Sequence, residues 1–123
     1  MTEKREGKMV NTKTSKITCT TIKYSRLSAS KTRRILDQIR GKKYQEALLI
    51  LAFMPYKPCY TIKKILKSAA SNLSTSNYKD IKIIEAFANQ GPKIKRFQAR
   101  AQGRAFPISK PTCHITIKLQ TIL

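Results

Sequence analysis

The sequence predicts an α+β fold: a small globular domain of three helices against a short antiparallel sheet, with a long protruding β-hairpin. Apolar residues recur at helical spacing over residues 29–73, and apolar and polar residues alternate before and after this segment. Near the C-terminus, two alternating segments flank a basic stretch that has no apolar face. A length of 123 residues suits one domain. We expect this domain at residues 16–123, after a flexible basic arm at residues 1–15.

The first predicted strand and helix are joined by Ser28. Residues 16–27 are rich in Ile and Thr in rough alternation, which predicts a strand. Ser28 suits the N-cap of the following helix, where its hydroxyl accepts a hydrogen bond from the first turn, and Gly41 ends that helix in a left-handed conformation. The apolar stripe of the helix consists of Ile35, Leu36 and Ile39. Three arginines off this stripe are expected to point outward: Arg33, Arg34 and Arg40.

Two further helices follow, separated by prolines. Residues 44–52 predict a helix whose buried side consists of Tyr44, Ala47, Leu48 and Leu51. Pro55 and Pro58 interrupt the pattern, and Pro58 suits the first turn of a third helix because the N–H that it lacks would be unpaired there anyway. The apolar side of the third helix consists of Cys59, Ile62, Ile65, Leu66, Ala69, Ala70 and Leu73. The polar cluster at residues 71–80 ends it.

A basic hairpin is predicted between two C-terminal strands. Alternation predicts strands at residues 81–89 and 113–121. The hairpin spans about residues 86–110, with its base in the core and its tip away from it, and turns near Gly103, which adopts left-handed conformations readily. Its cations are Lys93, Lys95, Arg96, Arg100, Arg104 and Lys110, and no acid follows Glu85. Because such a limb cannot fold on its own burial, it needs a partner to order it.

The net charge indicates a nucleic-acid partner. The chain has 26 Lys and Arg against 6 Asp and Glu, a net charge of +20. A compact domain with this charge repels itself unless a polyanion neutralises it, whereas an acidic small-molecule substrate or cofactor needs only a few cations. Lys and Arg contacts to phosphates supply most of the sequence-independent affinity for nucleic acid. In the hairpin, Phe97 and Phe106 either stack or wedge against bases or pack on each other across the two strands.

Membrane, secreted, metal-binding and enzyme classes find no support in the sequence. The longest uncharged apolar run, residues 47–54, is far shorter than the roughly 18 residues of a membrane span, and the N-terminus lacks the apolar segment of a signal peptide. Three widely spaced cysteines without a CxxC motif predict reduced, mostly buried thiols rather than disulfides or a zinc site. Cys113 and His114 are neighbours on a strand and point to opposite faces. The six acids are too scattered to hold the metal ions of a nuclease.

Several motifs resemble the large-subunit ribosomal protein L22 family. They are Arg26-Leu-Ser-Ala-Ser-Lys31, Ile35-Leu36-Asp-Gln-Ile39-Arg40-Gly41-Lys42, Glu46-Ala47-Leu48, Lys67-Ser68-Ala69-Ala70-Ser-Asn72, Gly91-Pro92, Lys95-Arg96, Ala99-Arg100-Ala101-Gln-Gly103-Arg104-Ala105 and His114-Ile115-Thr116. Their order and spacing agree with the family from about residue 15 to residue 119. The chain departs from the family at Ala29, Leu73 and Gln102, where proline, alanine and a basic residue are usual. These departures leave the predicted fold intact.

The resemblance implies a structural protein of the large ribosomal subunit that acts in early assembly and is not an enzyme. It implies a globular domain near the exit of the polypeptide tunnel and a hairpin that lines the tunnel wall. The implied partners are large-subunit (23S-type) rRNA, neighbouring large-subunit proteins and the nascent polypeptide. The expected rRNA-binding residues are Arg26, Lys31, Arg33, Arg34, Arg40, Lys42, Lys63, Lys67, Lys93, Lys95, Arg96, Arg100, Arg104 and Lys110. The expected tunnel-lining tip consists of Arg96, Phe97, Arg100, Gln102, Gly103 and Arg104.

Composition also bears on the origin of the chain. Isoleucine occurs 15 times and valine once, which indicates AT-rich codons. Together with the charged N-terminal extension, this favours a plastid-encoded member in the chloroplast over a mitochondrial or bacterial one. The alternative is a basic DNA-architectural protein of the nucleoid type, which would be expected to dimerise and to bind duplex DNA. A nuclease is the third class.

Overall fold

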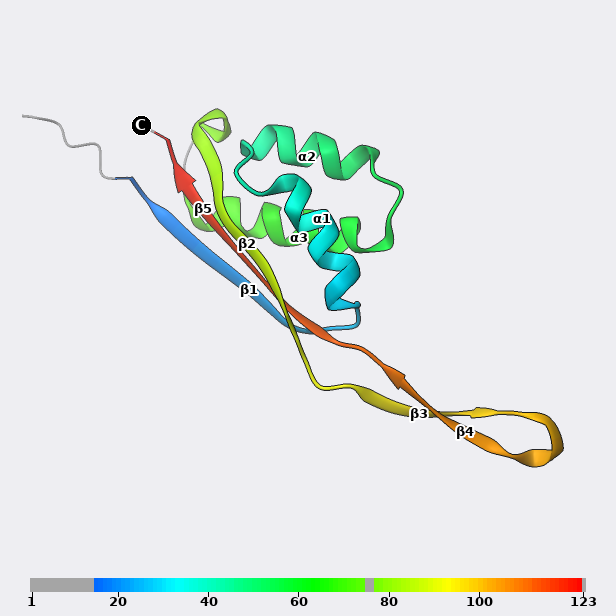
Figure 1. Ribbon diagram of the computed structural model, residues 1–123. Helices are drawn as coiled ribbons and strands as arrows, with labels where there is room; N and C mark the ends of the chain where they lie inside the picture. The colour runs from blue at the N-terminus through cyan, green and yellow to red at the C-terminus, as the bar shows by residue number, and fades with distance from the viewer. Residues whose placement is uncertain (1–14, 75–76, 123) are drawn as a thin grey trace, which may run out of the picture.

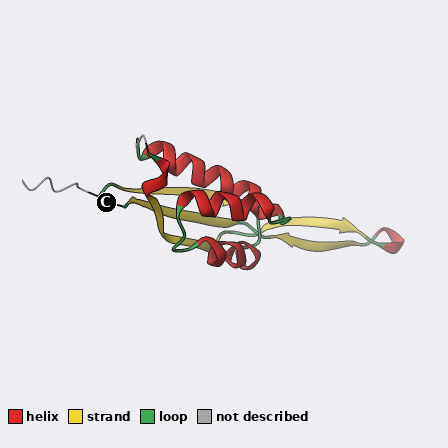
Figure 2. Ribbon diagram, turned by 90° about the horizontal axis from the view of Figure 1, so that it is seen from above, coloured by secondary structure: helices red, strands yellow, loops and turns green. Residues whose placement is uncertain are grey.

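The fold is a helical layer on an antiparallel sheet, and the computed structural model describes it for residues 15–74 and 77–122. In chain order the elements are β1 (Ile17–Ser25), α1 (Ala29–Ile39), α2 (Tyr44–Phe53), α3 (Lys57–Asn72), the 3-10 turn η1 (Tyr78–Asp80), β2 (Ile81–Gln90), β3 (Ile94–Ala99), the 3-10 turn η2 (Ala101–Gly103), β4 (Ala105–Lys110) and β5 (Cys113–Thr121). The helices cover one face of the sheet, and the hairpin of β3 and β4 projects beyond both layers (Figures 1 and 2). The predicted α+β fold with a protruding hairpin is confirmed. The predicted arm at residues 1–15 lies outside the described residues, apart from Ser15.

β5 is the centre of the main sheet and pairs antiparallel with β1 on one side and β2 on the other. Its alternating sequence explains this place, because Ile115, Ile117 and Leu119 are fully buried beneath the helices while the residues between them lie on the outer face. On that face, the Lys118 ammonium lies 2.7 Å from the Glu85 carboxylate. The hydrogen bond and the charge of Glu85 raise the pKa of Lys118. The predicted half-buried strand is confirmed.

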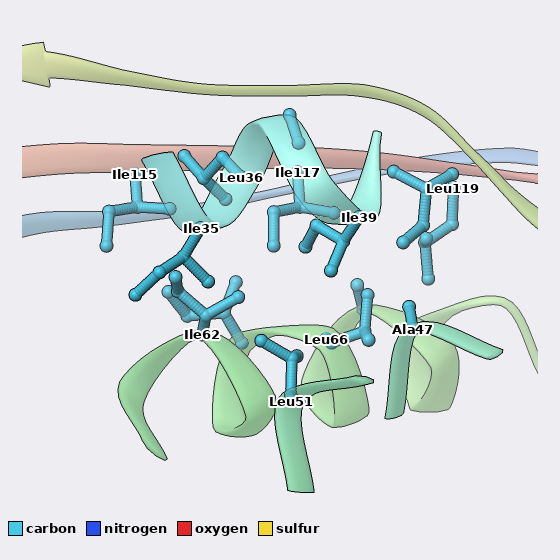
Figure 3. Close-up of a cluster of buried hydrophobic side chains, with 14 of the residues drawn as sticks. Ile35, Leu36, Ile39, Ala47, Leu51, Ile62, Leu66, Ile115, Ile117 and Leu119 are labelled. Atoms are coloured by element: carbon cyan, nitrogen blue, oxygen red, sulfur yellow. The ribbon is translucent and has the colours of Figure 1, made fainter. Parts of the chain in front are cut away.

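The core lies between α1, α3 and the sheet. Side chains from these elements point at one another in Figure 3, among them Leu36, Ile39, Ile62, Leu66 and Ile117, and all five are fully buried. All seven residues that were predicted for the apolar side of α3 are buried. In α2 the predicted inner side is also correct, with Leu48 only partly covered. The outer side of α2 is apolar as well, because Leu49 and Phe53 are exposed there.

Ser28 precedes α1 in the extended conformation of an N-cap, yet its side chain caps nothing. Its hydroxyl pairs with that of Ser30 over 3.1 Å. The Ser28 carbonyl accepts hydrogen bonds from both the N–H and the hydroxyl of Thr32, so Thr32 closes the first turn. The prediction of a side-chain cap by Ser28 is therefore wrong. Gly41 ends the helix with a φ of +77°, as predicted.

The protruding hairpin starts later than predicted. Residues 86–90, which the prediction placed in the hairpin, belong to β2 and pair with β5 in the main sheet. The reason is burial, since Ala86 and Ala88 are almost inaccessible beneath the helical layer. β3 and β4 then form a separate two-stranded sheet, and residues 91–93 and 111–112 join this sheet to β2 and β5 as the base of the hairpin.

Candidate nucleic-acid interface

The hairpin presents its two phenylalanines on opposite faces. In the register of β3 and β4, Phe97 lies opposite Pro107, and Phe106 lies opposite Gln98. Because directly opposed residues share a face and neighbours along a strand alternate, the two rings do not pack on each other across the hairpin. That interpretation is therefore wrong. Phe97 is 77% and Phe106 52% exposed, which leaves both rings open to stacking on a partner.

The cations of the hairpin form one continuous basic limb. All six that were predicted between residues 93 and 110 are exposed, and no acid stands among them in the chain. Within the described residues, the ion pairs are Asp37–Arg40 and Glu85–Lys118, and neither lies on the hairpin. Nothing in this part of the chain therefore neutralises the limb, and its charge is available to a polyanion.

The tip of the hairpin turns through two left-handed residues. Gly103 has a φ of +68°, as predicted, and Gln102 before it has a φ of +61°. The Arg100 N–H donates to the Arg104 carbonyl over 2.7 Å and closes the loop. Two arginines thus flank the end of the limb.

Five residues fix the hairpin base, where the limb leaves the body: Tyr24, Gly91, Pro92, Thr112 and His114. The Gly91 N–H donates to the Thr112 carbonyl over 2.9 Å, and the Thr112 hydroxyl donates to the Pro92 carbonyl. The Tyr24 N–H donates to Nδ1 of His114 over 3.0 Å, and the two rings meet edge to face with centroids 5.0 Å apart. Tyr24 adopts a φ of +57° at the point where the register of β1 shifts. The bonds between Gly91, Pro92 and Thr112 join the two strands to each other where the limb begins, and the Tyr24–His114 contact joins β1 to β5 beside them.

Arg33 of α1 and Arg40, the residue after this helix, have a structural role that the sequence did not indicate. The Arg33 Nε donates to the Ala88 carbonyl over 2.9 Å. Arg40 donates to the Ala86 carbonyl through Nε and Nη2, at 3.1 and 2.6 Å, and its Nη1 lies 2.8 Å from Asp37. Both side chains therefore reach back to β2 instead of simply pointing outward, because the free carbonyls at this sheet edge need donors.

The other predicted binding residues lie on the body of the protein. Arg26, Lys31, Arg34, Lys42 and Lys67 are exposed, and Lys63 is half-buried. Lys63 and Lys67 belong to α3 in the helical layer, whereas the hairpin extends away from that layer (Figure 1). The structure thus brings the hairpin cations together on one limb and leaves the cations of the body spread over several elements.

An aromatic and basic cluster at the turn between α2 and α3 was not predicted. Phe53, Tyr56 and Tyr60 are exposed there, and the Lys64 ammonium lies 4.4 Å from the centroid of the Tyr60 ring. The signal in the sequence is the interleaving of aromatic residues with lysines and prolines over residues 53–64. Because Pro55 and Pro58 interrupt the helical pattern, the sequence predicted this segment only as the boundary between two helices.

The described residues offer little for catalysis. Cys113 is buried, where desolvation raises the pKa of its thiol, and His114 lies on the opposite face of β5. Within residues 15–74 and 77–122, no three His, Cys, Asp or Glu side chains gather where they could hold a metal ion. In the same part of the chain, no helix has the length and apolar character to cross a membrane.

Comparison with known proteins gives one consistent family. Residues 20–120 match the family described as ribosomal protein L22p/L17e. The chain is 65% identical over 109 residues to large ribosomal subunit protein uL22c of Gracilaria tenuistipitata, which covers 87% of this chain and 95% of that protein. It is 63% identical over 98 residues to uL22c of Porphyra purpurea, covering 77% and 84%. It is 54% identical over 98 residues to large ribosomal subunit protein uL22 of Acaryochloris marina, covering 77% and 82%.

Proposed function

The chain belongs to the ribosomal protein L22p/L17e family, and from this premise we propose that it binds large-subunit rRNA chiefly through its hairpin. It is a structural protein of the large ribosomal subunit and not an enzyme. Relatives that carry the chloroplast name uL22c come from Gracilaria tenuistipitata, Porphyra purpurea and Physcomitrium patens. Its place is accordingly the plastid ribosome.

The single observation that supports rRNA binding is the unneutralised limb. Six exposed cations and two exposed phenylalanines project beyond the body with no acid among them. Phosphates of RNA neutralise such cations, and the release of condensed counterions drives the association. Unpaired bases can stack on the open aromatic rings. The two-stranded limb has little apolar burial of its own, so RNA on both faces is what keeps it ordered.

The hairpin lines the polypeptide exit tunnel in this proposal, and the body lies near the tunnel exit. The residues at the tunnel wall are Arg96, Phe97, Arg100, Gln102, Gly103 and Arg104. The nascent polypeptide passes these residues, and neighbouring large-subunit proteins contact the body. Because one limb contacts RNA far from the body, the protein can hold separate RNA segments together, which suits a role in early assembly.

The proposed rRNA-binding residues fall into two groups. The hairpin residues that bind phosphates are Lys93, Lys95, Arg96, Arg100, Arg104 and Lys110, and none of them belongs to an ion pair among the described residues. Of the residues on the body, Arg33 and Arg40 also hold the edge of β2, so a change in either would combine a structural with an RNA-binding effect. Arg26, Lys31, Arg34, Lys42, Lys63 and Lys67 complete the set. The hairpin is therefore where binding can be tested without disturbing the fold.

The test is reconstitution of large subunits followed by sedimentation in high salt. The variant replaces the three hairpin arginines (Arg96→Glu, Arg100→Glu and Arg104→Glu), and its control replaces three exposed lysines of the body that lie outside the proposed set (Lys16→Glu, Lys79→Glu and Lys82→Glu). Both change the net charge by the same amount. We expect the control to sediment with subunits and the hairpin variant to remain in the supernatant, although its helices stay folded.

Two results would contradict the proposal. One is equal retention of both variants in the subunits, which would show that the hairpin charges do not hold the protein. The other is preferential binding of the unaltered chain to duplex DNA with no subunit association, which would favour the DNA-architectural alternative.

A further inference from the structure

A cleft opens between α1 and the turn that joins α2 to α3. Its volume is about 550 Å³, within the roughly 300–1,000 Å³ range of small-ligand sites. The floor is apolar and consists of Ile35, Met54 and Pro58. The rim carries Lys31, Arg34, Tyr56 and Lys57, all exposed. No acid stands among the described residues that line the cleft.

The chemistry of this cleft suits one nucleotide. Its apolar floor can take the face of a base, and the ring of Tyr56 at the rim can stack on it. Lys31 and Arg34 supply a point charge and a guanidinium fork for a phosphate. The Gln38 amide on the same wall both donates and accepts, as the edge of a base requires.

Exposed aromatic residues continue from the cleft along the chain. Phe53 precedes the turn, and Tyr60 lies in the first turns of α3 beneath the Lys64 ammonium. Aromatic platforms interleaved with cations bind single-stranded nucleic acid, because every base has a face that can stack. An A-form RNA duplex offers its phosphates but keeps its base faces stacked on one another. The cluster therefore favours an unpaired strand.

We propose that this cleft holds one unpaired nucleotide of the large-subunit rRNA, with the base against Met54 and Tyr56 and the phosphate beside Lys31 and Arg34. The inference rests on the proposed function, since it takes rRNA as the polyanion. The hairpin contacts phosphates, and this cleft would be a second site, on the body, that also contacts a base. An extended segment of a neighbouring protein is the rival occupant, and the three cations without an acid favour RNA over it.

The test compares a fluorescent single-stranded oligouridylate with an RNA duplex of the same length at one salt concentration. The full chain carries the three hairpin reversals, because the hairpin would otherwise dominate binding. In this background Tyr56→Ala should weaken single-strand binding about tenfold, the loss of one stacked base, and duplex binding by less than about twofold. Tyr56→Phe should keep the affinity, since the ring remains.

A comparison of two lysine variants tests the role of the charge at the rim. Lys31→Ala removes a cation from the rim and should weaken single-strand binding severalfold. Lys79→Ala removes an exposed lysine at η1, which contacts the other end of α2, and should change the affinity by less than about twofold. Equal effects of the two lysine variants would overturn the proposal. So would a Tyr56→Ala variant whose losses on single strand and duplex are the same.

A second measurement separates this proposal from the proposed function. Ultraviolet irradiation of reconstituted subunits should leave a nucleotide adduct on the peptide that contains Met54 and Tyr56. If the chain sediments with subunits but this peptide carries no adduct, or is joined to a protein instead, the cleft proposal is overturned and the proposed function stands. If the unaltered chain does not sediment with subunits, the proposed function itself fails.

Discussion

Replacement of Gly91 by alanine should destabilise the protein by about 2–6 kcal/mol through the hairpin base. A Cβ at this position would lie 2.5 Å from the Thr112 hydroxyl oxygen and 3.2 Å from Cε1 of His114, so the threonine side chain must rotate away. Rotation breaks its hydrogen bond to the Pro92 carbonyl. Because Thr112 is only 3% exposed, leaving its hydroxyl unpaired costs about 1–3 kcal/mol. The crowding of the added methyl group costs about 1–3 kcal/mol more.

Equilibrium unfolding in urea measures this free energy, and a double-mutant cycle identifies its source. Thr112→Ala removes the hydroxyl that the new methyl group would strike, so Gly91→Ala should cost about 1–2 kcal/mol less in that background than in the unaltered chain. Gly41→Ala is the matched control, because its φ is +77° but nothing lies within 4 Å of its Cβ position. Its cost of about 1–2 kcal/mol should be the same in both backgrounds. A Gly91→Ala cost that does not depend on the Thr112 hydroxyl would refute the reasoning.

Three further measurements test the fold and the charge of the limb. Leu66→Ala should lower the free energy of unfolding by about 2–5 kcal/mol, since Leu66 is fully buried, and a loss below about 0.5 kcal/mol would show that this face of α3 is not core. A thiol reagent should modify Cys19 rapidly in the native protein but Cys59 and Cys113 only on unfolding, because burial hides these two thiols and raises their pKa; rapid modification of all three would contradict the structure. The logarithm of the binding constant for large-subunit rRNA should fall linearly with the logarithm of the salt concentration. Replacing the three hairpin arginines by glutamine should reduce the magnitude of this slope by roughly 2–3. An unchanged slope would mean that these arginines do not contact phosphates.

Local patterns predict most of the body of the protein. The apolar side of α3 and the alternation of β5 are properties of one segment each, and their buried residues were identified without knowledge of the neighbours. The left-handed turns at Gly41 and Gly103 follow from glycine itself. The N-cap prediction failed because the Ser28 hydroxyl pairs with the Ser30 hydroxyl instead of accepting from a backbone N–H of the first turn, and only the assembled backbone decides between the two.

The features that were missed depend on contacts between distant segments. The start of the hairpin is set by burial of Ala86 and Ala88 against the helical layer, and small residues give a weak alternation signal. The separation of Phe97 and Phe106 follows from the register, which the left-handed Gln102 helps to fix. The contacts of Arg33 with β2 cross 55 positions of the chain. Candidate phosphate-binding residues could be proposed from charge, but the hydrogen-bond partners of Arg33 and Arg40 could not.

Hydrogen exchange of residues 93–110, measured in the free protein and in the large subunit, tests the central claim most directly. In the free protein these amides should exchange far faster than those of α1 and α3, because the two-stranded limb lies outside the core and nearly all its residues are exposed. In the subunit, phosphates and bases on both faces should protect them, while the helices change little. Fast exchange of the limb in the subunit would contradict the claim that rRNA binds and orders it, as would strong protection in the free protein.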